Sequence, residues 1–257
     1  GHLDPRFLGI DRLYGTGSVT GLADRRVTVI GVGGVGSWAA EALVRSGIGG
    51  LRIIDGDDVC IANTNRQSQA LQGQYGRAKV EALAERLLAI HPQLRMEPVP
   101  RFLTADTLEP LLSGSDLVLD ACDALRVKVE TIVWCRRRKL PLVVVGSAGG
   151  RADPTRIQVR DLSRTEHDAM LSLVRRKLRK EFAFPRNRNR YFGVPAVYSL
   201  ENVRYPQADG RVSGMRSRSV EGSGIDCGGG LGAALHVTGS FAFAAVGKAL
   251  SMLLRER

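Results

Sequence analysis

Short apolar runs and longer amphipathic runs alternate along residues 27–146 of the chain. The short runs are rich in Val, Ile and Leu, which is typical of strands that are buried on both faces of a parallel sheet. They lie at residues 27–30, 116–121 and 142–145, and a further run ends at Asp55; residues 94–99, which include Arg95 and Glu97, are predicted as a further strand. The longer runs have helical spacing and lie at residues 38–44, 77–91, 104–112 and 125–139. This alternation predicts an α/β protein with a doubly wound, mostly parallel sheet.

The pattern changes after residue 150. Residues 156–162 alternate in a period of two, which predicts an antiparallel strand that extends the sheet. Residues 171–182 fit a basic amphipathic helix, and residues 206–226, rich in Gly, Ser and Arg, predict a flexible loop that leads to Cys227.

The apolar run at residues 231–254 is long enough to cross a membrane. Small residues dominate this run, and His236 and Lys248 interrupt it. We therefore predict a C-terminal helix of the core or of a dimer interface, and we do not expect membrane association.

A glycine-rich turn follows the first predicted strand, and an acid ends the second. The turn reads GVGGVG and contains Gly31, Gly33, Gly34 and Gly36. In a nucleotide-binding unit the first glycine permits a tight turn, the second lets a phosphate approach, and the last lets the helix pack closely. Asp55 lies 19 residues after Gly36, where a carboxylate accepts hydrogen bonds from a ribose. The stretch therefore predicts a Rossmann-like nucleotide site, with phosphates at the helix N-terminus.

The polar residues that follow distinguish two kinds of nucleotide chemistry. A dehydrogenase would need a hydride-handling site elsewhere. This chain instead has polar and charged residues after the second strand, on the next helix and after the fourth strand. They are Asp57, Asn63, Arg66, Lys79 and Asp123. Cations and carboxylates around one phosphate cleft suit nucleotidyl transfer, in which basic groups and Mg²⁺ neutralise the charge on the α-phosphate and the leaving pyrophosphate.

The positive charge of the chain is confined to one half. Residues 1–130 hold 14 Lys and Arg against 16 Asp and Glu, whereas residues 131–257 hold 23 against 10. The net charge of +11 therefore belongs to the second half. Such a distribution predicts a surface for a polyanion, most simply nucleic acid, although a solvated basic face is the alternative.

The densest basic stretch is interleaved with aromatic residues. Eight basic residues follow one another with a single acid among them: Arg175, Arg176, Lys177, Arg179, Lys180, Arg186, Arg188 and Arg190. Phe182, Phe184, Tyr191 and Phe192 lie in or beside this stretch. Such aromatic rings can stack on unpaired bases while arginines bind phosphates. The alternative is that the rings pack into the interior.

The cysteines indicate a reducing environment. Cys60, Cys122, Cys135 and Cys227 are far apart and form no CxxC pair, so we expect no zinc site. Four isolated thiols fit the cytoplasm better than a disulfide framework.

The combination of GVGGVG, the acid-ended strand, DDVCIANTNRQ, the helical lysine and DACD resembles the ubiquitin-activating-enzyme-like superfamily, in particular the ThiF/MoeB group of ATP-dependent adenylating enzymes. The segments RLYG, GSAGGRADPTRIQVRDLSRT and DCGGGLGAALHVTGSFAFAAV resemble one branch of this group, the tRNA threonylcarbamoyladenosine dehydratases. The resemblance implies that residues 1–150 are the ATP-binding adenylation region. Residues 151–257 would be a basic substrate and dimerisation extension of the same domain.

The resemblance also implies roles for individual residues. The four glycines would form the phosphate turn, and Asp55 would bind the ATP ribose with Asp57 beside it. Asn63 and Arg66 resemble family residues that contact the triphosphate. Lys79 matches a lysine that reaches the phosphates.

Two further roles depend on partners of the chain. Asp123 matches the acid that holds Mg²⁺. Arg12 resembles an N-terminal arginine that reaches across a homodimer into the partner's active site. Ubiquitin-type relatives use a cysteine that forms a thioester, for which Cys227 is the only candidate in a glycine-rich loop.

The implied reaction is an ATP-dependent dehydration. ATP would adenylate the carboxylate of a threonylcarbamoyl group on the adenosine beside the tRNA anticodon, and the modification would then cyclise and expel AMP. Two alternatives remain. One is adenylation of the C-terminal glycine of a ubiquitin-like sulfur carrier, against which the missing zinc cysteines weigh. The other is a non-catalytic ATP-binding scaffold in a sulfur relay with a cysteine-desulfurase partner.

Overall fold

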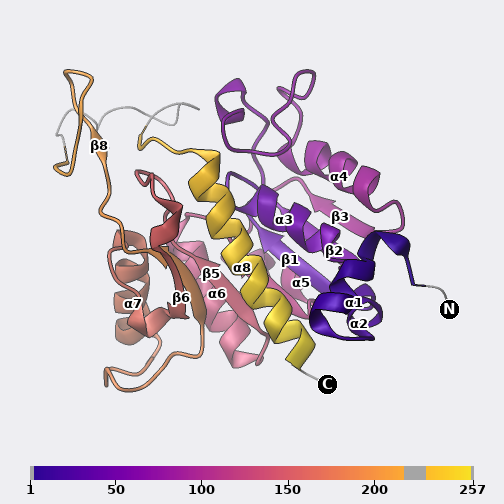
Figure 1. The fold of residues 1–257 in the computed structure, drawn as a ribbon. Helices are drawn as coiled ribbons and strands as arrows, with labels where there is room; N and C mark the ends of the chain where they lie inside the picture. The colour runs from indigo at the N-terminus through magenta and orange to yellow at the C-terminus, as the bar shows by residue number, and fades with distance from the viewer. Residues whose placement is uncertain (1–2, 217–229, 256–257) are drawn as a thin grey trace.

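A computed structural model of the chain describes residues 3–216 and 230–255. These residues form a seven-stranded sheet of order β3-β2-β1-β4-β5-β7-β6 (Figure 1). Its strands are β1 (Arg26–Ile30), β2 (Gly50–Ile54), β3 (Arg95–Val99), β4 (Leu117–Asp120), β5 (Leu142–Val145), β6 (Ile157–Asp161) and β7 (Pro195–Ser199). All neighbours pair in parallel except β6, which is antiparallel to β7. The predicted α/β class, with a Rossmann-like doubly wound and mostly parallel sheet, is confirmed.

Helices cover both faces of the sheet. One face carries α3 (Gly36–Arg45), α4 (Lys79–Ile90) and α8 (Leu235–Arg255). The other carries α5 (Leu108–Leu112), α6 (Leu125–Arg137) and α7 (Ala169–Glu181) (Figure 1). Two short helices, α1 (Leu8–Tyr14) and α2 (Ser18–Ala23), precede β1. Both faces of the central strands are therefore buried, as their continuous apolar runs require.

The second half of the chain departs from the sequence prediction at two points. The interior strand β7 was not predicted, and it pairs in parallel with β5 through Val144–Ala196. The expected loop at residues 206–226 begins with a short hairpin, in which β8 (Tyr205–Pro206) pairs with β9 (Val212–Ser213). Residues 217–229, which include Cys227, lie outside the described part of the chain.

The C-terminal helix α8 is a core element. It is long and apolar enough to span a membrane, but Val237, Phe241 and Ala245 are buried between it, the sheet and α3. This packing agrees with the predicted core helix. The start of α8 also reaches the glycine turn, because a Cβ on Gly34 would lie 3.2 Å from the Thr238 methyl carbon.

The turn between β1 and α3 closes on itself. Gly31 has a φ of 81°, a left-handed conformation that glycine adopts without strain. A Cβ on Gly36 would lie 1.6 Å from the Gly31 carbonyl oxygen, so no side chain fits there. Gly33 is open by contrast, since its Cβ would meet only Gln67 Nε2, at 3.7 Å. The turn therefore needs glycine at both ends and leaves Gly33 accessible.

This close approach predicts a large effect of a single methyl group. We expect Gly36→Ala to lower the free energy of unfolding by about 2 kcal/mol or more, because the new Cβ meets backbone that cannot rotate away. Gly247→Ala in α8 is the matched control, since nothing lies within 4 Å of its Cβ position. That change should stabilise the helix by about 0.5–1 kcal/mol. Urea denaturation measures both, and equal effects would contradict the interpretation.

Candidate functional site

The glycine turn and Asp55 lie together at the carboxyl ends of the parallel strands, here called the carboxyl edge. The strand order reverses between β1 and β4, which is where open α/β sheets bind ligands. Asp55 Oδ2 accepts a hydrogen bond from Val32 N (2.9 Å), and Oδ1 accepts one from Asp57 N (2.9 Å). Each carboxylate oxygen retains acceptor capacity. Asp55 therefore fixes the turn and can still bind a ribose hydroxyl.

The segment after β2 docks on the glycine turn. Trp38 Nε1 donates to the Arg66 carbonyl oxygen (2.9 Å), and Gln69 Nε2 donates to the Val32 carbonyl oxygen (2.8 Å). A Cβ on Gly34 would lie 3.2 Å from Arg66 Cγ, so the stem of the Arg66 side chain lies against the turn, while its Nη1 donates to the Ala62 carbonyl oxygen (3.1 Å) and to Asn65 Oδ1 (3.0 Å). Asn63 is buried, and its Oδ1 accepts from Cys60 N (2.9 Å). Arg66 therefore lies at the glycine turn, and the Asn63 amide oxygen fixes the loop backbone at Cys60.

Gln69 is a site residue that the sequence analysis missed. Its side chain is 1% exposed, and its Oε1 has no hydrogen-bond partner among the described residues. The signal was the pair of glutamines in NRQSQA, where alternate polar residues in a loop face one buried surface.

Lys79 and Asp57 lie side by side at the carboxyl edge. Lys79 is the first residue of α4, and its backbone N donates to the Asp57 carbonyl oxygen (2.9 Å). The Lys79 Nζ lies 3.9 Å from Asp57 Oδ2, with the lysine side chain 10% exposed and the aspartate 60% exposed. The buried lysine stem restricts the movement of the ammonium group, which lies beside Asp57.

Asp123 is exposed at the end of β4, across the switch point from Asp57. Within the described residues its carboxylate has no hydrogen bond or ion pair. The backbone of Ala121 and Cys122 lies against Gly31, at 3.2 Å from its Cβ position, which places Asp123 next to the phosphate turn. In the described residues no three His, Cys, Asp or Glu side chains cluster to hold a metal. One carboxylate together with substrate phosphates is the usual Mg²⁺ site, so the arrangement fits this ion.

A buried ion pair supports the end of β4. Lys128 Nζ lies 3.2 Å from Asp120 Oδ1 and donates to the Asp120 carbonyl oxygen (3.1 Å), with both side chains fully buried. Asp120 Oδ1 also accepts from Cys122 N (3.1 Å). Burial opposes the charge of Lys128, but Asp120 outweighs it and raises the lysine pKa. The sequence analysis placed Asp120 in a strand and did not predict its partner.

Arg12 does not join these residues within one chain. It is an exposed residue of α1. Phe7, directly before α1, lies 5.1 Å from the His91 ring and packs on Gly47, at the amino ends of β3 and β2. Arg12 therefore lies near the amino ends of the strands, whereas the glycine turn lies at their carboxyl ends.

The sequence model of the ThiF family matches residues 9–255. The chain belongs to the ThiF family. It is 45% identical over 252 residues to the tRNA threonylcarbamoyladenosine dehydratase of Escherichia coli, covering 98% of this chain and 94% of that protein. It is 39% identical to the Haemophilus influenzae enzyme of the same name, covering 99% and 95%. The structure matches the E. coli dehydratase in complex with ATP with a TM-score of 0.85 and 40% identity, covering 98% and 94%.

Two of the three described cysteines of this ThiF-family chain, Cys122 and Cys135, are poor nucleophiles. Burial raises the pKa of the Cys135 thiol to about 12, and burial together with Asp120 raises the pKa of Cys122 above its usual range. A thiolate is the reactive form, so these two residues act as small apolar side chains at neutral pH.

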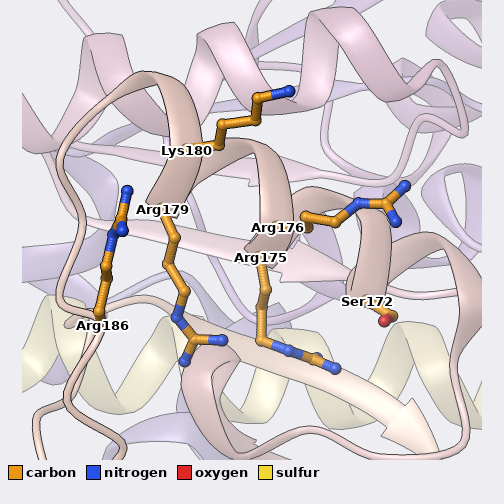
Figure 2. Close-up of a pocket in the computed structure, with 6 residues that line it drawn as sticks. All are labelled: Ser172, Arg175, Arg176, Arg179, Lys180 and Arg186. Carbon is orange, nitrogen blue, oxygen red and sulfur yellow. The ribbon is translucent and has the colours of Figure 1, made fainter.

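The basic stretch lines two pockets on α7 and the loop after it. The first, of about 380 Å³, is lined by Ser172, Arg175, Arg176, Arg179, Lys180 and Arg186 (Figure 2). The second, of about 750 Å³, shares Arg175 and Arg179 with it and adds Arg188 and Tyr191. Asp168 caps α7 and accepts from Ser147 N (2.7 Å), directly after β5. Helix α7 therefore begins at the carboxyl edge and carries its basic residues away from it.

The aromatic residues of this stretch mostly pack inward. Phe192 is buried, and Phe184 contacts it edge-on with ring centroids 5.1 Å apart. Phe182 also packs against the core, so these three rings form no stacking surface. Tyr191 is 66% exposed, with the Arg164 guanidinium 5.0 Å from its ring centroid. Tyr191 alone of the four remains available to a base.

The Asp120–Lys128 pair predicts a strong dependence on both partners. Lys128→Met leaves a buried carboxylate without its cation, and we expect the free energy of unfolding to fall by about 3–5 kcal/mol. Asp120→Asn combined with Lys128→Met leaves no buried charge and should recover most of that loss. Urea denaturation measures both, with exposed Lys139→Met as a control that should change stability by less than about 0.5 kcal/mol. A single-variant loss as small as that of the control would disprove the role of the pair.

Proposed function

We propose that this chain is an ATP-dependent tRNA threonylcarbamoyladenosine dehydratase. The observation that carries the proposal is similarity to two dehydratases over 98–99% of this chain, and a glycine turn with an arginine and a lysine at the same end of the sheet supports it. The substrate is threonylcarbamoyladenosine beside the tRNA anticodon, and the product is its cyclised form.

The reaction has two steps. A carboxylate oxygen of the threonylcarbamoyl group attacks the α-phosphorus of ATP, and the bond to pyrophosphate breaks. A nucleophilic atom of the same modification then attacks the activated carbonyl carbon and releases its proton to water, and the bond to AMP breaks with one oxygen of the former carboxylate leaving on AMP. Overall the modification loses the elements of water. Activation is needed because a carboxylate is a poor electrophile, whereas AMP is a good leaving group.

The chain's own residues stabilise the charge that develops on phosphate. The N–H groups of the glycine turn and the N-terminus of α3 bind the phosphates. Arg66, whose stem lies against the turn, and Lys79, held beside Asp57, neutralise the α-phosphate and the leaving pyrophosphate. Asn63 holds the loop that presents Arg66, and Asp55 positions the ribose. Asp123 would hold Mg²⁺, which supplies further charge neutralisation on the phosphates.

A homodimer gives Arg12 a role. Because Arg12 lies at the edge opposite its own glycine turn, it reaches an active site only in a second copy of the chain. The exposed position of α1 supports this arrangement.

The tRNA binds along the basic surface of α7, defined by Arg175, Arg176, Arg179, Lys180 and Arg186. Arg175 and Arg179 extend in the same direction from adjacent turns (Figure 2). Within the described residues no ion pair involves Arg176, Lys180 or Arg186, so their charges are available to phosphates. The cytoplasm, where tRNA is modified, is the expected location.

A variant at Lys79 tests the reaction. We expect Lys79→Ala to lower formation of the cyclised nucleoside about 10²–10³-fold, because it removes a group that stabilises the transition state. The protein is incubated with ATP, Mg²⁺ and threonylcarbamoylated tRNA. The nucleosides are then analysed by mass spectrometry for a loss of about 18 Da from threonylcarbamoyladenosine, which is the mass of one water molecule. Lys139→Ala, at the exposed end of α6, should match the wild type.

Other outcomes would identify a different function. ATP consumption on an added sulfur-carrier protein, with tRNA unchanged, would support carrier adenylation. ATP binding without turnover on either substrate would support a scaffold in a sulfur relay.

Substitutions on α7 test the tRNA surface. We expect Arg176→Gln, Lys180→Gln and Arg186→Gln together to weaken tRNA binding and to reduce the slope of log K against log salt by about two to three. The control replaces three exposed arginines at or near the amino ends of the strands, Arg6, Arg45 and Arg95, by Gln. Binding measured from about 50 to 200 mM salt gives both slopes. An equal change in both triple variants would show that tRNA binds elsewhere.

A further inference from the structure

An exposed phenylalanine borders the candidate nucleotide site. Phe102 follows β3 at the carboxyl edge, and its side chain is 60% exposed. Its neighbours Val99 and Leu103 are buried in the core cluster on that face of the sheet, which Phe102 does not join. The ring therefore contributes little to the packing of the core, although Val99 and Leu103 close to it in the chain are buried.

The Phe102 ring is held in place by Gly56. A Cβ on Gly56 would lie 2.6 Å from Phe102 Cδ2 and 2.7 Å from Cε2, so the ring lies directly against the Gly56 backbone. Any side chain at residue 56 would displace the ring. Gly56 follows Asp55, the acid that faces the ribose, so the ring and the acid belong to one corner of the crevice.

The strand order places this corner beyond the ribose. The phosphate turn follows β1, Asp55 follows β2, and β3 is the next strand, with Asp55 N donating to the Val99 carbonyl oxygen (3.2 Å). A nucleotide with phosphates on the turn and its ribose at Asp55 extends its base toward β3. Phe102 is an exposed large apolar side chain at that end.

We propose that Phe102 is the stacking residue for the base of the nucleotide, with adenine lying on the face of the ring that Gly56 does not cover. The inference rests on the ATP site proposed above. A base on an aromatic side chain gains affinity through stacking, and the loss on removal of the ring corresponds to about 5- to 150-fold in Kd. Gly56 is then required because it keeps the ring in place.

The test separates the base from the phosphates. Calorimetry gives the Kd of AMP, ATP and inorganic tripolyphosphate for the full chain and its variants. We expect Phe102→Ala to weaken AMP and ATP by about 10- to 100-fold and to leave tripolyphosphate unchanged. Phe102→Tyr should retain nucleotide affinity, and Gly56→Ala should weaken nucleotides in the same selective way. Phe243→Ala is the control, because Phe243 is 54% exposed on α8.

Each other outcome has a definite meaning. An AMP Kd for Phe102→Ala within twofold of the wild type overturns the inference, as does an equal loss of AMP and tripolyphosphate affinity. Both results leave the proposed reaction standing, because the wild type still binds ATP. A wild type that binds neither AMP nor ATP removes the nucleotide site and the inference together.

Discussion

The contact between the Gly31 carbonyl and Gly36 sets the start of α3 and therefore the geometry of the whole carboxyl edge. Because no side chain separates these two residues, the helix begins directly above the turn, and its free N–H groups face the crevice. Helix α8 packs along α3, and its first turn places Thr238 beside Gly34. The C-terminal helix thus packs on the turn that we propose as the phosphate site, which couples the two halves of the chain.

Two pairs of acids lie at the carboxyl edge, and each pair has one buried and one exposed member. Asp55 and Asp120 each lie at a strand end, are buried, and accept a hydrogen bond from the backbone N two residues later. Asp57 and Asp123 follow them by two and three residues and are exposed. The buried acids fix the loops, and the exposed acids are left for cations. Lys128 is needed only at β4, because Asp120 has no exposed surface while Asp55 retains some.

The sequence predicted the features that local pattern determines. The strands β1, β4 and β5 are mostly apolar runs, and the glycine turn has its own spacing, so they were predicted near their observed positions. Strand β7 was missed because Pro195–Ser199 begins with a proline and follows a basic stretch, and only the hydrogen-bonding edge of β5 explains its place. Lys128 was missed because a helical lysine normally faces solvent, and its burial follows from how α6 lies on the sheet. Of the aromatic residues, the sequence could not show that Phe192 packs inward and Tyr191 outward.

The orientation of α7 would let the two proposed substrates, tRNA and ATP, reach the glycine turn from different sides of the sheet. Asp168 ties the start of α7 to Ser147 after β5, and at about 1.5 Å per residue Lys180 lies about 18 Å further along the helix. A tRNA on this surface enters the crevice from the side of β5 and β7. In the proposed reaction the base end of ATP would lie toward β3, at the other end of the sheet order. The two substrates would then meet at the glycine turn without competing for surface, beside the Arg66 side chain and the backbone that leads to Asp123.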